Sequence, residues 1–302
     1  MIIPRPLFRY QIMVISLTAA HQQFIVDLQH QHKTTNTILA YGKDIAQFLA
    51  FLSQNSISTP DHITPDTIDQ FQASLPQAYT AKSVSRKLNS LKTFCRFLHQ
   101  NGITAANPST HVHNPPVTPH PPRILSPLEY RALRDAARTD TRLAAIVELL
   151  LQTGLRIGEV SHLKLDDITP DHRSLTITPY ESRLGRTVPL SPSARQALVR
   201  YLENRPHSSD PTLFVTKTGR PFLIRNIRAS INRLFRQAGI KSATVNDLRH
   251  TFIATQIRAG IPLNFIAEVV GHKRLSTTEI YLKYVKPGTP NKQTPAPQLA
   301  EL

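Results

Sequence analysis

The sequence predicts a mainly α-helical protein with a small β-sheet, an α+β fold divided between two domains. Apolar residues recur at helical spacing through residues 17–102 and again through most of 124–286. Between these regions, residues 103–123 are rich in proline and histidine, a composition that favours an extended, semi-rigid linker over packing. Two short runs, 174–180 and 186–191, are predicted to form a β-hairpin. A chain of 302 residues is long enough for two ordinary cores.

The two ends of the chain are expected to lie outside both domains. Residues 1–16 are predicted to be an N-terminal extension, because their apolar run is too short for a signal peptide. Met13 is a candidate natural start within this extension. Residues 287–302 form a tail rich in Pro, Gln and Thr, with Leu299 and Leu302 as its apolar anchors.

Four helices are expected in the first domain. They cover 17–31, 34–54, 64–75 and 80–100, and Gly102 ends the last of them. Projection of the fourth helix at about 100° per residue separates two faces. The face that should be buried is apolar, and it consists of Val84, Leu88, Leu91, Cys95 and Leu98. The opposite face is polar and basic, and it consists of Lys82, Arg86, Asn89, Thr93 and Arg96.

The proline-rich linker contains three histidines. His111, His113 and His120 lie within it, and a His-x-His pair is able to bind metal. These residues lack cysteine or carboxylate companions at metal-ligand spacing. We therefore expect a solvated linker here and no metal site.

The second domain is expected to begin with a capped helix. Ser126 stands at N-cap spacing from Glu129, and Pro127 suits the first helical position. The helical pattern continues to about Leu163, and 213–216 is a possible third strand after the hairpin. Further helices are expected at 193–204, 223–237, 246–258, 262–270 and 276–283.

The charge balance indicates a nucleic-acid partner. The formal net charge is +16 and the isoelectric point is about 10.3, as expected of a protein that neutralises phosphates. Residues 123–286 hold 26 Lys and Arg against 14 Asp and Glu, an excess of 12. A membrane-surface protein would need a basic amphipathic anchor or a long apolar span, and neither is found in the sequence. The single cysteine, Cys95, precludes an intrachain disulfide and fits a reducing compartment, so a cytoplasmic protein is expected.

Residues near the C-terminus carry phosphoryl-transfer chemistry. Arg249, His272 and Tyr281 lie in one short, mostly helical region, and Ser276 with Glu279 has capping-box spacing just before Tyr281. An arginine can fork onto phosphate oxygens, a histidine can donate or share a proton, and a tyrosine hydroxyl can attack phosphorus. These are the parts of a covalent phosphoryl-transfer site that needs no metal ion.

Three segments together resemble the tyrosine recombinase, or phage integrase, family. They are the TGLRIGEV box at 153–160, the NDLRHT segment at 246–251, and the Gly271-His272 pair that precedes Tyr281. The resemblance covers about residues 17–286. It implies an N-terminal helical core-binding (SAM-like) domain that clamps DNA and a C-terminal tyrosine-recombinase catalytic domain. The motif spacing resembles that of Xer-type or transposon-borne recombinases.

The resemblance implies a site-specific DNA recombinase or integrase that cleaves and rejoins double-stranded DNA without metal, ATP or other cofactor. Tyr281 would attack the scissile phosphodiester, leave a 3′-phosphotyrosyl link and release a 5′-hydroxyl. Arg156 and Arg249 would stabilise the charge that develops on the phosphate. His272 would hydrogen-bond a non-bridging oxygen or help to move the tyrosine proton, and Glu159 would be a structural partner. A homo- or hetero-tetramer on paired sites is implied as the working assembly.

Candidate DNA-contact residues come from both domains. The resemblance implies that the basic face of the fourth helix touches DNA, and Arg225 and Arg228 enrich the 223–237 helix in a similar way. Residue type alone does not separate phosphate contact from base readout. The candidates on the fourth helix are Lys82, Arg86, Asn89 and Arg96. A protein bound to cellular DNA would be associated with the nucleoid.

Two departures from the family pattern predict reduced activity. The family usually has a histidine three residues before Arg249, where this chain has Asn246, which can hydrogen-bond but cannot shuttle a proton. The usual hairpin lysine is missing, and Arg183 or Arg186 stands in the hairpin instead. Two alternatives to the recombinase follow. One is a catalytically weak or silent relative that binds DNA as an accessory factor, and the other is a type IB topoisomerase.

Overall fold

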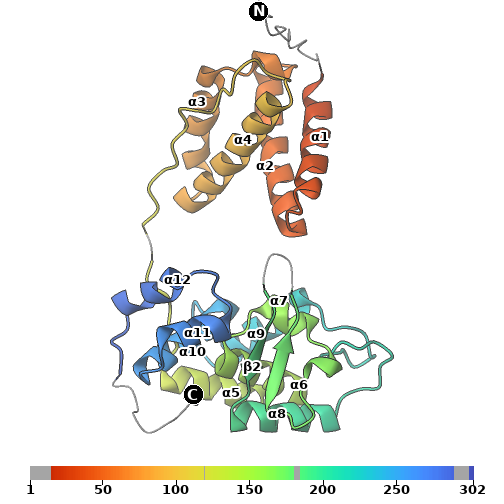
Figure 1. The fold of residues 1–302 in the computed structure, drawn as a ribbon, viewed down its shortest axis with the longest axis vertical. Helices are drawn as coiled ribbons and strands as arrows, with labels where there is room; N and C mark the ends of the chain where they lie inside the picture. The colour runs from red at the N-terminus through yellow and green to blue at the C-terminus, as the bar shows by residue number, and fades with distance from the viewer. Residues whose placement is uncertain (1–14, 119, 180–183, 289–298) are drawn as a thin grey trace, which may run out of the picture. The chain divides into compact units, whose positions relative to one another are not determined.

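The computed structural model describes residues 15–118, 120–179, 184–288 and 299–302. The chain divides into two compact units, residues 1–119 and 120–302, each with its own hydrophobic core (Figure 1). The predicted start at Met13 and the hairpin residue Arg183 lie outside the described residues. No helix in the described ranges is long and apolar enough to cross a membrane.

The first unit is helical, as predicted. Each of its α-helices follows a Ser or Thr whose hydroxyl accepts a hydrogen bond from a backbone amide of the first turn. Phe24, Phe48 and Phe94 are fully buried at its centre. Its elements are α1 (Leu17–His30), α2 (Thr35–Gln54), η1 (Pro60–His62), α3 (Pro65–Ser74), η2 (Leu75–Gln77) and α4 (Ala81–Gln100).

Helix α4 has the two faces that its sequence predicts. The predicted apolar residues are all buried, and burial raises the pKa of the Cys95 thiol to about 12, so Cys95 is a core residue. The candidate DNA-contact side chains are all exposed: Lys82, Arg86, Asn89 and Arg96. Arg86 nevertheless forms an ion pair with Asp44, a buried carboxylate that also accepts hydrogen bonds from Lys87 and Ser90. Part of the Arg86 charge is therefore compensated within the unit.

The predicted solvated linker is wrong for its first part. Ile103 and Val112 are buried in the core of the first unit, so residues 103–112 pack instead of spanning solvent. His111 Nε2 lies 2.8 Å from Asp69 Oδ1, and the Asn114 amide donates to Asn89 Oδ1 at 2.9 Å. The two apolar side chains make packing favourable despite the prolines around them.

The second unit is an α+β assembly built around the buried helices α6 and α10. The capping box of Ser126 and Glu129 is present as predicted. The described part of the unit has one sheet, the antiparallel β1–β2 hairpin, in which Ser174 pairs with Pro189 and Ile177 with Arg186. Its elements are α5 (Pro127–Ala137), α6 (Thr141–Thr153), α7 (Ile157–His162), η3 (Leu165–Asp167), β1 (Ser174–Ile177), β2 (Arg186–Pro189), α8 (Pro192–Glu203), α9 (Ile224–Gln237), α10 (Val245–Arg258), α11 (Leu263–Val270), α12 (Ser276–Glu279) and η4 (Ile280–Lys283).

Two predicted elements of this unit are corrected. The possible third strand at 213–216 is not a strand, because this stretch makes only an isolated bridge, between Val215 and Pro221. The last predicted helix is one α-helical turn followed by a 3-10 turn, and its N-cap is Leu275, without a side-chain hydrogen bond. Ser276 therefore starts this helix and does not cap it.

A left-handed glycine ends α6 and redirects the chain into the site. The helical region predicted up to Leu163 is broken here, because Gly154 has φ +62°. A Cβ at this position would lie 2.5 Å from Phe252 Cδ1, so a side chain has no room. The break places Arg156 at the N-cap of α7, where its backbone amide donates to Glu159 Oε2 at 2.9 Å.

The last four residues pack on their own unit. Leu299 and Leu302 lie against the hydrophobic core. The buried Gln256 side chain exchanges two hydrogen bonds with the backbone of Ala300, each 2.8 Å long. The buried Gln152 side chain does the same with Leu302 at 3.2 Å. The described end of the tail is therefore anchored by two internal glutamines.

Candidate active site

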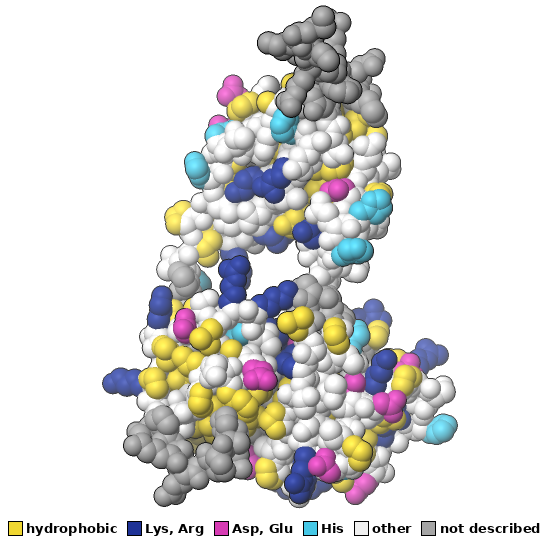
Figure 2. Space-filling model, viewed as in Figure 1, with side chains coloured by type: hydrophobic (Ala, Val, Ile, Leu, Met, Phe, Trp, Pro, Cys, Tyr) yellow, Lys and Arg dark blue, Asp and Glu magenta, His cyan; other side chains and the backbone are white. Residues whose placement is uncertain are grey.

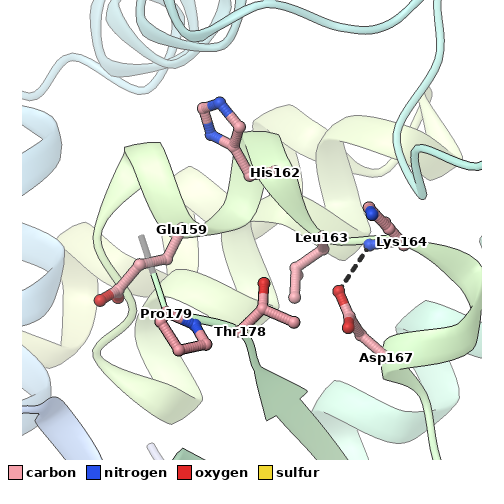
Figure 3. A pocket seen from close by; sticks show the side chains of 7 residues that line it. All are labelled: Glu159, His162, Leu163, Lys164, Asp167, Thr178 and Pro179. Carbon is pink, nitrogen blue, oxygen red and sulfur yellow. Dashed lines mark hydrogen bonds between the residues drawn. The ribbon is translucent and has the colours of Figure 1, made fainter. Parts of the chain in front are cut away.

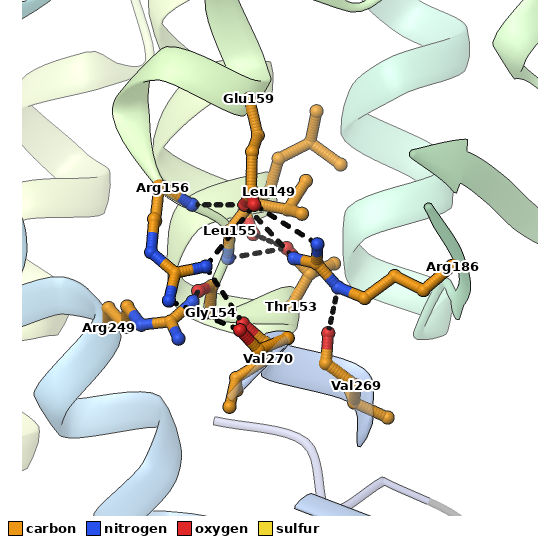
Figure 4. Close-up of polar contacts among 11 residues, drawn as sticks. Leu149, Thr153, Gly154, Leu155, Arg156, Glu159, Arg186, Arg249, Val269 and Val270 are labelled. Atoms are coloured by element: carbon orange, nitrogen blue, oxygen red, sulfur yellow. Dashed lines mark hydrogen bonds and ion pairs between the residues drawn. The ribbon is translucent and has the colours of Figure 1, made fainter. Parts of the chain in front are cut away.

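A buried carboxylate organises the arginines of the candidate site. Glu159 on α7 accepts two hydrogen bonds from the Arg186 guanidinium, each 3.0 Å long, and one from Arg156 Nη1 at 3.3 Å (Figure 4). Burial alone would raise the pKa of Glu159, but the hydrogen bonds and charges of the two arginines bring it below its ordinary value. Glu159 is therefore an ionised partner of both arginines.

Arg186 is held away from the role that the hairpin lysine would play. Its Nε donates to Val269 O at 2.7 Å, its other nitrogens bind Glu159, and its side chain is only 7% exposed. A Cβ on Gly271 would lie 2.8 Å from Arg186 Nη1, so glycine is needed there for the close approach. Arg186 is therefore engaged within the fold, and Arg183, the other candidate for the role of the missing lysine, lies outside the described residues.

Arg156 and Arg249 lie near each other and bind two different stretches of backbone. Arg156 donates to Val270 O and Gly271 O at 3.2 and 3.3 Å, and Arg249 Nη1 donates to Gly154 O at 2.6 Å (Figure 4). Arg249 is 5% exposed, and its Nη2 has no hydrogen-bond partner among the described residues. Burial and the charge of Arg156 lower the pKa of Arg249 to about 9, so it is cationic at neutral pH. A buried N–H with no partner is costly and calls for an acceptor.

His272 follows the left-handed Gly271 at the end of α11. Its Nδ1 lies 2.8 Å from the hydroxyl of Thr278, which is fully buried. Burial, with the charges of Arg249 and Arg156, lowers the pKa of His272 to about 3. The ring is therefore neutral in the free site, and Thr278 fixes its orientation.

Tyr281 is buried beside these cations on η4. Its side chain is 6% exposed, and burial raises the pKa of its phenol to about 12 against the opposing charges of Arg249 and Arg156. Its hydroxyl lies 2.5 Å from His250 Nδ1. Tyr284, the neighbouring tyrosine, is 36% exposed and lies at the surface.

The partner of Tyr281 is a residue that sequence reasoning did not assign. His250 lies on α10, and its Nε2 is 2.7 Å from Asn246 Nδ2. Asn246 therefore reaches the tyrosine through His250. The four-residue spacing of Asn246 and His250 puts them on one helix face and is visible in the sequence.

A pocket lies beside the hairpin and shares Glu159 with the arginine cluster. Glu159, His162, Leu163, Lys164, Asp167, Thr178 and Pro179 line this pocket (Figure 3). Figure 3 shows Lys164 at the opposite end of the pocket from the Glu159 carboxylate. Lys164 is therefore not grouped with the cations of the site.

The predicted DNA-contact arginines of the second unit are exposed. Arg225 and Arg228 are exposed on α9, whereas Ile227 and Ile231 of the same helix are buried. Lys and Arg side chains also appear at the surface of both units in Figure 2. Their side chains are therefore accessible at the surface of the unit, whereas Arg249 is buried within the site.

Comparison with known proteins gives concordant matches over both units. The Phage integrase family matches residues 123–286, and the family described as Phage integrase, N-terminal SAM-like domain, matches residues 22–102. The chain is 34% identical to the tyrosine recombinase XerD of Lacticaseibacillus casei, over 81% of this chain and 86% of the relative. It is 28% identical to the tyrosine recombinase XerC of Roseiflexus castenholzii, over 89% and 90% of the two chains.

The fold is also found among solved structures. A lambda integrase tetramer bound to a Holliday junction matches with a TM-score of 0.73 at 18% identity, covering 91% of this chain and 80% of the other. The two relatives matched in sequence are tyrosine recombinases, which disfavours the type IB topoisomerase alternative. The extent of these matches shows that the chain belongs to the phage integrase family of tyrosine recombinases.

Proposed function

We propose that this chain is a site-specific DNA recombinase in which Tyr281 attacks a scissile phosphodiester, forms a 3′-phosphotyrosyl link and releases a 5′-hydroxyl. The observation that supports it most strongly is the buried Nη2 of Arg249, which has no hydrogen-bond partner in the described part of the chain and lies in a cationic site with the Tyr281 phenol. A phosphate oxygen supplies both the missing acceptor and the negative charge that this site favours.

The arginines stabilise the charge that develops during phosphoryl transfer. Arg156 and Arg249 offer donors to the non-bridging oxygens, and Glu159 keeps Arg156 fixed before DNA arrives. Donors that are already oriented lose little free energy to reorganisation in the transition state. Arg186 adds positive charge to the site, while three of its five N–H groups bind Val269 O and Glu159.

His272 acts as an oriented hydrogen-bond donor. When the Thr278 hydroxyl donates to Nδ1, the ring proton is on Nε2, which can donate to a non-bridging oxygen. A bound phosphate adds negative charge beside the ring, so it raises the pKa of His272 from its value of about 3 in the free site.

The proposed partner is double-stranded DNA, and the proposed working assembly is a tetramer. The exposed basic residues of α4 and α9 meet the DNA backbone, with Arg86 contributing less because Asp44 compensates its charge. The tetrameric state of the lambda integrase complex supports a homo- or hetero-tetramer on paired sites. A protein with this activity works in the cytoplasm, in association with the nucleoid.

DNA affinity should depend steeply on salt. Removing one phosphate-contacting cation, as in Lys82→Ala or Arg225→Ala, should weaken binding and reduce the slope of log K against log salt by about 0.9. Fluorescence anisotropy over a salt series measures this slope. Arg138→Ala is the matched control, because Arg138 is exposed and lies outside the proposed contact faces. Equal slopes for wild type and both variants would contradict the assigned contacts.

A substrate with sulfur in place of the bridging 5′-oxygen tests the proposed function against the silent accessory alternative. A thiolate leaves without protonation, so this substrate should be cleaved faster than the normal one if the missing lysine limits proton donation. Arg183, whose guanidinium gives up a proton reluctantly, is proposed as a charge stabiliser. The sulfur substrate should therefore rescue Arg183→Ala only in part.

Two results would contradict these assignments. Full rescue of Arg183→Ala by sulfur would make Arg183 a proton donor. Wild-type protein that cleaves neither substrate on a verified site would favour the accessory alternative.

A further inference from the structure

We propose that His250 accepts the phenolic proton of Tyr281 during attack on phosphorus, with Asn246 orienting its ring. This inference rests on the proposed function, because it assigns a further residue to the same reaction. His250 follows Arg249 directly in the sequence. Its side chain contacts Tyr281, which lies 31 residues further along the chain.

Two successive contacts connect the side chains of Asn246, His250 and Tyr281. Asn246 Nδ2 lies 2.7 Å from His250 Nε2, and His250 Nδ1 lies 2.5 Å from the Tyr281 hydroxyl. The His250 and Tyr281 rings are 5.7 Å apart at their centroids and tilted by 46°, and the 2.5 Å contact joins the ring nitrogen to the hydroxyl. A general base must lie within hydrogen-bond reach of the proton that it removes.

The Asn246 amide decides which nitrogen of His250 carries the proton. In the structure Nδ2 faces Nε2, an arrangement that places the ring proton on Nδ1. The two ends of an amide have nearly the same shape, and the proposed step includes a half-turn of this amide that presents Oδ1 to Nε2. With Oδ1 accepting from Nε2–H, Nδ1 has a free lone pair and accepts the Tyr281 O–H. Histidine oriented by an amide also serves in papain-like sites, where the trio is Cys-His-Asn.

The charges around His250 keep it neutral and ready to accept. Burial lowers the pKa of His250 below 6.5, and Asp247 opposes this effect while Arg249 adds to it. From the other elements, Tyr281 and His272 face the same region. The Tyr281 phenol, with a pKa of about 12, is a poor nucleophile without a base. His272 is less suited than His250 to be this base, because its pKa is about 3 and Thr278 occupies its Nδ1.

The step balances as a single displacement. The Tyr281 O–H bond breaks and its proton moves to His250 Nδ1 while the phenolic oxygen bonds to phosphorus. The bond from phosphorus to the 5′-oxygen breaks, and that oxygen takes a proton from a solvent water, which leaves as hydroxide and is neutralised by the buffer. Rejoining runs in reverse, with the His250 imidazolium returning its proton to the departing Tyr281 oxygen. Asn246 can hydrogen-bond but cannot carry a proton, so in this step it orients His250, which accepts the proton.

Single-turnover cleavage of a nicked suicide substrate tests the proposal across a pH series. Wild-type cleavage should fall as pH drops through the pKa of His250, because the imidazolium cannot accept a proton. His250→Ala should be about 10²–10⁴-fold slower, the usual contribution of a general base. Its acid limb should vanish, and its rate should rise with pH toward the pKa of the phenol. DNA affinity and thermal unfolding should match those of wild type and of His207→Ala, a control at an exposed histidine of the same unit.

A fluorinated tyrosine at position 281 separates proton transfer from a structural role. Fluorine lowers the phenol pKa, so it should accelerate His250→Ala far more than wild type. Asn246→Ala should show a smaller loss of rate with the acid limb retained. Equal rates for wild type and His250→Ala, or an unrescued defect with the acid limb intact, would overturn the proposal. If wild-type protein itself forms no adduct on a verified site, the proposed function fails and not this assignment alone.

Discussion

A Tyr281→Phe protein should bind its DNA site with unchanged affinity and form no covalent protein–DNA adduct. The substitution removes one oxygen from a buried ring, so the packing of η4 against the core is kept. The only hydrogen bond lost among those described is the one to His250. Without the hydroxyl, no group in this position can attack phosphorus. Denaturing electrophoresis of the reaction with a suicide substrate measures the adduct directly.

Tyr284→Phe is the matched control for this experiment. Tyr284 lies three residues further along and is 36% exposed, so it is the nearest alternative nucleophile. Its substitution should leave adduct formation unchanged. An adduct formed by Tyr281→Phe and lost in Tyr284→Phe would reverse the assignment of the nucleophile.

Removal of Arg249 should slow single-turnover cleavage by about 10²–10³-fold, the usual cost of losing one oriented donor to a developing oxyanion. Arg249→Lys should be nearly as slow, although it keeps the charge. A guanidinium donates to Gly154 O through Nη1 while Nη2 remains for the phosphate, whereas an ammonium is a single point that cannot match this geometry.

Arg258→Lys is the control on the same helix. Arg258 is exposed near the end of α10, so its replacement should change neither cleavage nor folding. Thermal unfolding separates a catalytic defect from an unfolded protein. Cleavage by Arg249→Lys at the wild-type rate would show that the buried Nη2 does not bind the scissile phosphate.

The sequence identified candidate residues of the site better than the contacts between them. Arg156, Arg249, His272 and Tyr281 are recognisable because each lies in a short motif, and the structure brings them together. The contact of His250 with Tyr281 depends on how η4 folds back over α10. The engagement of Arg186 by Glu159 depends in the same way on packing between β2 and α7. Spacing along the chain carries no direct information on such contacts.

For the fold as well, features set by local sequence patterns were predicted, and features set by contacts between distant residues were not. Helices with regular apolar periodicity, such as α2 and α4, agree with prediction because their pattern and caps are local. The stretch at 213–216 failed as a strand because a β-sheet needs a partner strand that the apolar run does not specify. The packing of Ile103 and Val112 was missed because two apolar residues among prolines form no period.

Peptide mapping of the trapped adduct tests the central claim most directly. Wild-type protein is captured on a suicide substrate, the DNA and protein are digested, and the modified peptide is sequenced by mass spectrometry. We expect the nucleotide, attached through its 3′-phosphate, on Tyr281. Attachment to Tyr284 or to any other residue would contradict the account, as would the absence of an adduct on a verified site.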